Sequence, residues 1–188
     1  MPESEETTVR RAQAGDRDAF RCLFERYQNQ VYGYVRRMVS EENLAADLAQ
    51  DAFVRAYEAL PRLKAPGAFR GWLFQIAANR VRDHWKRPCR DALSLDAPAA
   101  ETGGELAVPD PGPGPERLAV REQMRTSVAE ALAKLPPERR EVVVLHHLNG
   151  LDVRTIAAML GVPEGTVKSR LGRARADLRQ LLAEWMEE

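Results

Sequence analysis

Cysteine and long apolar runs are scarce in this sequence of 188 residues. Its two cysteines, Cys22 and Cys89, form no CxxC pair and no disulfide framework, so no cysteine metal site is indicated. No apolar run approaches the ~18 residues that a membrane span requires. The acidic, polar start Met1–Glu6 lacks the pattern of a secretory signal peptide. We therefore expect a cytoplasmic protein that is not inserted in a membrane.

The chain has no formal net charge, because 28 basic residues balance 28 acidic ones. The basic and acidic residues are nevertheless distributed unevenly along the chain. Residues 10–92 contain 16 basic and 10 acidic residues, 93–115 contain four acidic and no basic residues, and 116–188 contain 12 basic and 11 acidic residues. Because a polyanion responds to local fields rather than to the total charge, nucleic acid is not excluded as a partner.

Residues 93–115 combine acidity with five prolines and four glycines. Proline removes a backbone donor and fixes φ, so this stretch cannot sustain a helix or a central strand. We interpret it as a flexible linker between two domains, 10–92 and 116–184.

Both flanking segments show helical periodicity. Apolar residues recur at three- and four-residue spacing from Ala19 to Met38, which predicts an amphipathic helix. A second helix is predicted over Glu41–Leu60 with Ser40 as its N-cap, and a third over Ala68–Lys86. The β-branched run Val142–Val144 also falls within helical spacing. The pattern predicts an all-α fold of two small helical domains.

The sharpest pattern lies near the C-terminus and is typical of a DNA-binding helix-turn-helix. Gly161 stands where such a motif breaks between its two helices, and Val162 can fill the angle between them. The expected apolar faces of the two helices contain Ile156, Ala157 and Leu160, then Val167, Leu171, Ala174 and Leu178.

The opposite face of the second helix is basic and carries small residues. Lysine and arginine bond guanine edges in a major groove, serine serves several bases, and glycine or alanine permits a close approach. Flanking side chains suit phosphate contacts instead. We expect the bases to be read by Lys168, Ser169 and Arg173, and the phosphates to be contacted by Thr166, Arg170 and Arg175.

Two features of the first segment allow more than one interpretation. On the helix predicted over Glu41–Leu60, an apolar Val54 lies among charged residues, which suits either a partner surface or a solvated face. Between Leu60 and Trp85, aromatic and basic residues interleave as they do in proteins that bind single-stranded nucleic acid. Part of that stretch also has the spacing of a buried stripe: Phe69, Leu73, Ile76 and Ala77.

Four stretches together resemble the extracytoplasmic-function sigma factors, which are small two-domain initiation subunits of bacterial RNA polymerase. They occur in the family's order on both sides of the linker: Asp47–Tyr57, Phe69–Asn79, Leu135–Arg140 and Ile156–Arg175. The resemblance implies sigma region 2 in the first domain and sigma region 4 in the second. It also implies an alternative sigma factor without enzymatic activity, cofactor or metal.

The resemblance assigns a partner to each surface. The β′ clamp helices of core RNA polymerase would dock on Asp47, Gln50, Asp51, Val54 and Arg55. The minus-10 element of promoter DNA would be melted and captured by Leu63, Lys64 and Asn79, with Trp72 and Arg80 nearby. Region 4 would read the minus-35 element while the β flap holds it in place. Family members are commonly held by an anti-sigma factor until a stress signal releases them.

Three other classes of function compete with this interpretation. A conventional helix-turn-helix regulator with an N-terminal sensor or dimerisation domain would explain residues 150–180 equally well, but not the charged face around Asp51. A DNA enzyme such as a recombinase would need a nucleophile-base motif, a metal-ligand cluster or a P-loop, and none is found. A pure protein-interaction module would leave the basic helix unexplained. The three histidines, His84, His146 and His147, lie apart from carboxylates and cysteines at ligand spacing.

Overall fold

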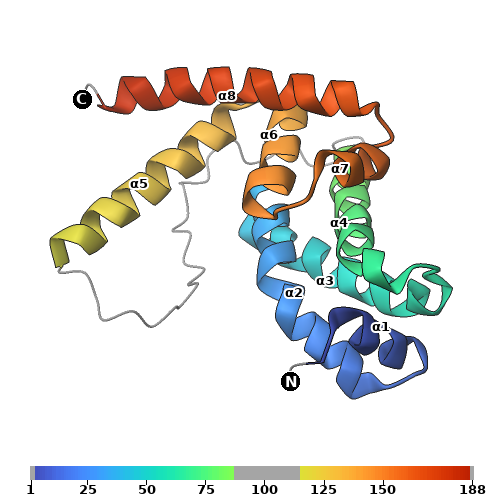
Figure 1. Cartoon of the computed structure of the whole chain (residues 1–188). Helices are drawn as coiled ribbons and strands as arrows, with labels where there is room; N and C mark the ends of the chain where they lie inside the picture. The colour runs from blue at the N-terminus through green and yellow to red at the C-terminus, as the bar shows by residue number, and fades with distance from the viewer. Residues whose placement is uncertain (1–2, 87–114, 187–188) are drawn as a thin grey trace.

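The computed structural model describes residues 3–86 and 115–186, and every regular element in these ranges is a helix (Figure 1). The predicted all-α fold is thereby confirmed. The predicted linker lies outside the described residues except for Pro115, which begins α5. The helices are α1 Glu5–Gln13, α2 Arg17–Met38, α3 Glu42–Ala59, α4 Phe69–Lys86, α5 Pro115–Lys134, α6 Pro137–Val143, α7 Val153–Leu160 and α8 Glu164–Met186.

Three shorter helical turns complete the fold. Two 3₁₀ turns, Leu60–Arg62 and Pro66–Ala68, connect α3 to α4, and each contains a proline in its first turn. A π turn, Val144–Leu148, extends α6, so the run Val142–Val144 is helical as predicted. None of the described helices is long and apolar enough to cross a bilayer.

The helices predicted over the first segment are confirmed as α2, α3 and α4, but the predicted N-cap of α3 is wrong. Glu41 remains extended, with ψ 127°, so α3 begins at Glu42 and Ser40 lies one residue too early to cap it. The Ser40 carbonyl instead accepts a hydrogen bond from Arg36 at 2.9 Å. This helix begins without a side-chain cap.

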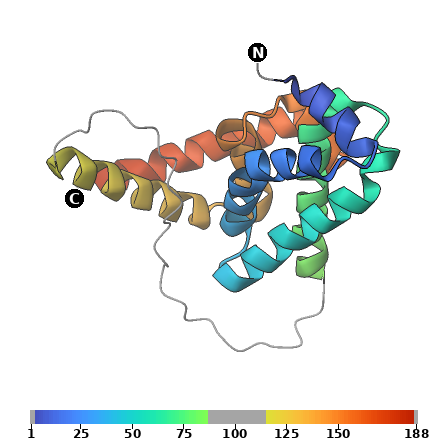
Figure 2. The ribbon, with the colours of Figure 1, turned by 90° about the horizontal axis from the view of Figure 1, so that it is seen from below.

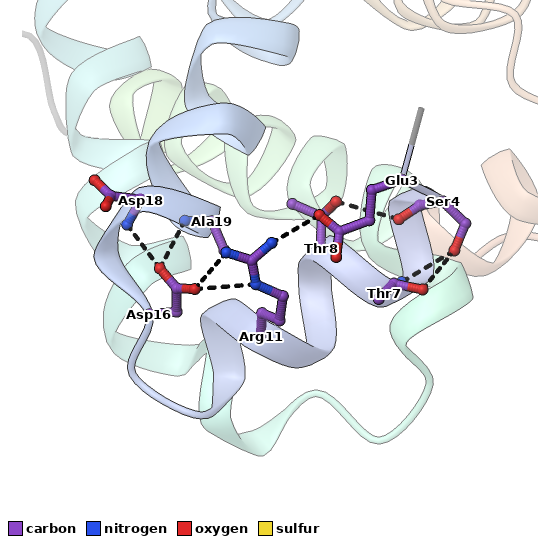
Figure 3. A network of polar contacts seen from close by, with 8 residues as sticks. All are labelled: Glu3, Ser4, Thr7, Thr8, Arg11, Asp16, Asp18 and Ala19. Atoms are coloured by element: carbon purple, nitrogen blue, oxygen red, sulfur yellow. Dashed lines mark hydrogen bonds and ion pairs between the residues drawn. The ribbon is translucent and has the colours of Figure 1, made fainter. Parts of the chain in front are cut away.

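Helix α1 was not predicted from the sequence, although its ends carry the usual signals. Ser4 caps it by accepting from the Thr7 backbone N–H at 3.2 Å (Figure 3). Glu5 and Glu6 occupy the first turn, and arginines occupy the last, which complements the helix dipole. At nine residues, the helix is too short to show a clear apolar repeat.

The junction between α1 and α2 is held by one arginine and one aspartate. Arg11 donates to both Asp16, at 2.7 and 3.0 Å, and Glu3, at 2.8 Å (Figure 3). Asp16 also caps α2 by accepting from the backbone N–H groups of Asp18 and Ala19. The bond from Ala19 and the nearby Arg11 guanidinium lower the pKa of Asp16 below its ordinary value.

The two groups of helices, α1–α4 and α5–α8, are called here the N-terminal and C-terminal domains. The N-terminal core contains the fully buried rings of Tyr34, Phe69 and Phe74, and the C-terminal core contains Leu145 and Ile156. The apolar clusters of the two domains are continuous. Helix α7 lies against α4, and α8 runs along the outer side of the C-terminal domain (Figures 1 and 2).

Candidate functional site

The turn between α7 and α8 has the sharp break that the sequence predicted. Asp152 caps α7 by accepting from the Thr155 backbone N–H and hydroxyl, each at 2.8 Å, and these bonds lower the pKa of Asp152. Gly161 ends α7 in the left-handed region, at φ 65° and ψ 34°, which residues with a Cβ rarely adopt. The Val162 N–H then donates to the Ala157 carbonyl at 3.1 Å. This geometry is that of a helix-turn-helix.

Helix α8 presents two distinct faces. Val167, Leu171 and Ala174 are buried against the C-terminal core, as predicted. The predicted base-reading residues all lie exposed on the other side: Lys168, Ser169 and Arg173. A Cβ added to Gly172 would meet no atom within 4 Å, so packing inside the protein does not require glycine there. The exposed face is therefore free to approach another molecule.

The three residues expected to contact phosphates are placed differently from one another. Arg175 is exposed, whereas Thr166 is half-buried near the start of α8. Arg170 forms an ion pair with Glu138 on α6 at 2.5 Å, and only 22% of its side chain is exposed. In this structure, Arg170 links α6 to α8 rather than extending into solvent.

A hollow of about 540 Å³, called here the α6–α8 hollow, brings most of these residues together. Two of its members, Glu138 and Arg139, had no role predicted from the sequence. Arg139 pairs with Asp177 at 2.6 Å, so two ion pairs join α6 to α8. Both residues belong to Leu135–Arg140, one of the four stretches that carry the family resemblance. The periodicity of a single helix does not show that this stretch faces α8. The hollow is lined by Pro136, Glu138, Arg139, Gly165, Thr166, Ser169, Arg170 and Arg173.

A second surface is an open groove of about 810 Å³ between α2 and α3, called here the α2–α3 groove. Three large apolar side chains around it are unusually exposed: Phe24 at 37%, Tyr57 at 45% and Val54 at 50%. Phe20 packs edge-on against Tyr57, and Phe24 against Phe53, with ring centroids 4.8 Å apart in each pair. Exposed apolar groups that gather in one place indicate a binding surface.

The structure separates the five residues predicted for polymerase docking. Gln50 and Val54 line the α2–α3 groove, while Asp47 and Arg55 are exposed elsewhere on α3. Asp51 is engaged within the domain, because its carboxylate pairs with Arg55 at 2.9 Å and with Arg80 of α4 at 3.6 Å. The contribution of α2 was not predicted from the sequence, since the spacing of Phe20 and Phe24 matched a buried stripe.

The residues predicted for the minus-10 element lie on α4 and on the turns before it. Trp72 and Asn79 are two helical turns apart and share one face of α4; Asn79 is exposed and Trp72 is half-buried beside Phe69. Lys64 is exposed on the preceding loop. Leu63 is half-buried, and its carbonyl accepts from Gln13 of α1 at 2.8 Å. The aromatics Phe69 and Phe74 are buried, so they belong to the core.

Arg80 is turned away from the face that Trp72 and Asn79 share. Its guanidinium pairs with Asp83 and with Asp51, and 20% of its side chain is exposed. Arg80 therefore joins α4 to α3.

The described residues contain no cluster of three or more histidine, cysteine or carboxylate side chains that could hold a metal ion. His146 is engaged with the Leu151 carbonyl at 2.8 Å, and its ring contacts that of His147. Burial and the neighbouring His146 lower the pKa of His147. The two histidines thus belong to the turn between α6 and α7.

Comparisons with known proteins match both domains. The family "Sigma-70 region 2" matches residues 23–90, and "Sigma-70, region 4" matches residues 125–178. The RNA polymerase sigma-H factor of Pseudomonas aeruginosa is 34% identical over 191 residues, which cover 99% of this chain and 97% of that protein. The ECF RNA polymerase sigma-E factor of Escherichia coli K12 is 35% identical over 177 residues, which cover 92% and 91%.

Solved structures with a similar fold include a protein whose title names it as a sigma factor. The structure of CnrH in complex with the cytosolic domain of CnrY matches with a TM-score of 0.69 and 29% identity, covering 97% of this chain and 99% of that one. The sigma factor RpoE in complex with the anti-sigma factor NepR, from Bartonella quintana, has the same fold, with a TM-score of 0.67, 22% identity and coverage of 87% and 96%. The chain therefore belongs to the extracytoplasmic-function family of RNA polymerase sigma factors, which are transcription initiation factors and not enzymes.

Proposed function

We propose that this sigma factor docks on core RNA polymerase through the α2–α3 groove and reads promoter DNA through α4 and α8. The observation that supports this best is the coexistence of two exposed surfaces of opposite chemistry on one chain. One is the apolar α2–α3 groove, and the other is the face of α8 with Lys168, Ser169 and Arg173. A regulator with a sensor domain would need only the second.

The α2–α3 groove suits the β′ clamp helices as its occupant. A partner helix lays an apolar stripe into such a groove, and side chains at helical spacing fill it. Val54 and Tyr57 would contact that stripe, while Asp47, Gln50 and Arg55 would bond its polar edge. Asp51 acts indirectly, since it already pairs with Arg55 and Arg80.

The minus-10 element is proposed to meet the face of α4 that contains Trp72 and Asn79. An unpaired base costs a few kcal/mol to unstack, and a complementary pocket offsets that cost. Lys64 would contact the backbone of the melted strand, and Leu63 would close the pocket from the loop. Arg80 has a positioning role, because its ion pairs hold α4 against α3.

The minus-35 element is proposed to meet α8, with the β flap holding the C-terminal domain over it. Lys168, Ser169 and Arg173 would contact base edges, and Arg175 would contact phosphates. Arg170 would exchange Glu138 for a phosphate on binding. The solved complex of the sigma factor RpoE with the anti-sigma factor NepR supports an anti-sigma factor as a further partner, released in the cytoplasm by a stress signal.

The proposal is tested by titrating the labelled full chain with sigma-free bacterial core polymerase and following fluorescence anisotropy. We expect saturable binding, and run-off transcription from a subset of promoters. A folded chain, free of inhibitor, that fails to bind core polymerase at micromolar concentration would overturn the proposal. In that case, stable dimers and palindromic footprints would favour a conventional regulator.

Removing the Arg173 guanidinium should weaken recognition of the minus-35 element while leaving the affinity for core polymerase unchanged. A good bidentate base contact contributes about 1–3 kcal/mol of discrimination, so Arg173→Ala in the holoenzyme should lose about 5- to 150-fold of its preference for the native over a scrambled element. Arg179→Ala, at an exposed position later on α8, is the matched control for charge. If the preference survives at matched salt, Arg173 does not read bases.

Removing the negative charge of Glu138, which pairs with Arg170, should strengthen binding to minus-35 DNA by a small factor. Glu138 is exposed, so its ion pair with Arg170 contributes less than about 1 kcal/mol. Glu138→Gln should therefore raise the affinity of the holoenzyme for minus-35 DNA about two- to fivefold and steepen its salt dependence. Glu130→Gln, an exposed acid on α5, is the control. An unchanged salt slope would show that Arg170 stays paired in the complex with DNA.

A further inference from the structure

The connection between α3 and α4, residues 60–68, is called here the α3–α4 loop, and it contains both Leu63 and Lys64. Each of its two 3₁₀ turns is only three residues long. In the first turn, the Leu63 N–H donates to the Leu60 carbonyl at 3.0 Å. Turns of this kind have poorer hydrogen-bond geometry than an α-helix. The shape of the α3–α4 loop therefore depends on contacts from other elements.

Gln13, the last residue of α1, supplies such a contact. Its Nε2 donates to the Leu60 carbonyl at 3.0 Å and to the Leu63 carbonyl at 2.8 Å. The amide nitrogen has two hydrogens, so it can make both bonds at once. Because both partners are carbonyls, the nitrogen rather than the oxygen of the amide must face them. Within residues 3–86 and 115–186, no other side chain hydrogen-bonds to the α3–α4 loop.

Helix α1 holds Gln13 beside the α3–α4 loop (Figure 2). Arg11 joins the end of α1 to Asp16 at the start of α2, and Gln13 lies between these two residues in the sequence. The same helix also reaches the second turn of the loop, because a Cβ added to Gly67 would lie 3.9 Å from the Glu6 carboxylate. The Gln13 carboxamide therefore contacts the loop from an anchored helix end.

We infer that Gln13 is a positioning residue for capture of the minus-10 element, because its carboxamide sets the backbone that presents Leu63 and Lys64 to the melted strand. The inference rests on the proposed function, in which these two residues contact that strand. Without the donor, the Leu63 carbonyl loses the bond from Gln13, and the α3–α4 loop samples more conformations. DNA must then order the loop as it binds, and that loss of conformational entropy weakens capture.

The variant that tests this role is Gln13→Met, which keeps an unbranched side chain of similar length but has no N–H donor. Methionine and glutamine are similar helix formers, so α1 should remain folded. In the free chain, we expect the Leu63 amide hydrogen to exchange with solvent about tenfold faster, since local opening controls exchange. The affinity for core polymerase, measured by anisotropy, should not change, because Gln13 does not line the α2–α3 groove.

Capture is then measured in the holoenzyme, on a promoter fragment that the native holoenzyme transcribes. The fragment has 2-aminopurine in place of one adenine of the minus-10 element, and the fluorescence of this base rises when it leaves the stack. Because a net hydrogen bond changes an equilibrium by about three- to tenfold, Gln13→Met should lower the equilibrium constant for unstacking by that factor. Binding of the same holoenzyme to duplex minus-35 DNA should stay the same, which separates weaker capture from general damage to the protein.

Gln13→Lys restores a donor at the same position and provides the rescue. The lysine ammonium has three hydrogens and no acceptor, so it can bond both carbonyls. A basic residue also suits the last turn of α1. We expect this variant to recover most of the base unstacking that Gln13→Met loses. Ala14→Lys, at the adjacent exposed position, is the matched control for added charge and should behave as the native chain does.

Unchanged exchange of the Leu63 amide in Gln13→Met would refute the role of Gln13 in holding the α3–α4 loop. Faster exchange together with native base unstacking would refute the positioning role while leaving the proposed function intact. Equal defects in Gln13→Met and Gln13→Lys would refute it as well, because donation to the two carbonyls would then not matter. If the native holoenzyme unstacks no minus-10 base, the proposed function fails and the positioning role fails with it, whereas faster exchange in Gln13→Met would still be observed.

Discussion

Replacing Val54 with glutamate should lower the affinity of the chain for core RNA polymerase at least about 100-fold. Half of the Val54 side chain is exposed at the rim of the α2–α3 groove, where a partner helix would cover it. Leaving a carboxylate unpaired in a covered interface costs about 3–5 kcal/mol, and 1.4 kcal/mol corresponds to a factor of ten in affinity. Glutamate is a good helix former, so α3 should remain folded.

The measurement is the anisotropy titration with core polymerase, accompanied by far-ultraviolet circular dichroism of each variant. Cys22→Glu is the matched control, because Cys22 is exposed on α2 but does not line the groove. It introduces the same charge on the same domain. If both variants bind core polymerase as the native chain does, the groove is not the docking site. If both lose affinity equally, the effect is one of net charge.

Asp51 would be a poor choice for this experiment, although the sequence places it on the same face as Val54. Its carboxylate pairs with Arg55 and Arg80, and Arg80 links α3 to α4. An arginine at position 51 would bring three guanidinium groups together and weaken the domain. Loss of polymerase binding would then have two explanations.

Local patterns were sufficient to predict most helices of this protein. The three- and four-residue spacing identified α2, α3 and α4, and Gly161 marked the turn between α7 and α8. The two errors of prediction, at α1 and at the N-cap of α3, also have local causes. Helix α1 is too short for periodicity to show, and the position of the α3 cap depends on the backbone angle of Glu41. Chain geometry at a helix end is not encoded in the identity of one capping residue.

The ion pairs and hydrogen bonds between helices could not be predicted from local sequence patterns. Asp51–Arg80 and Glu138–Arg170 join helices that are distant in sequence, and each changes the role expected for an arginine. The contact between Tyr34 and Glu141 spans the two domains. Such pairs depend on how helices pack, which the periodicity of a single helix does not determine.

Replacing Phe74 with alanine should reduce the free energy of unfolding of the N-terminal domain by about 3–5 kcal/mol, the usual loss for a buried aromatic ring. Phe74 is completely buried and packs edge-on against Tyr34, with ring centroids 5.9 Å apart. Small domains are stable by only about 5–15 kcal/mol, so this loss is a large share. Urea unfolding followed by tryptophan fluorescence measures it, since Trp72 and Trp85 belong to the same helix.

Phe24→Ala provides the comparison, because Phe24 is a phenylalanine of the same domain with 37% of its surface exposed at the α2–α3 groove. It should cost less than about 2 kcal/mol of stability and instead weaken binding to core polymerase. Phe74→Ala should also weaken the hydrogen bond between Tyr34 and Glu141, because Phe74 supports the Tyr34 ring whose hydroxyl donates to that carboxylate. Equal stability losses in the two variants would show that the ring at position 74 is not held as tightly as its burial implies. A reversed order of polymerase affinities would instead point to a docking surface away from the groove.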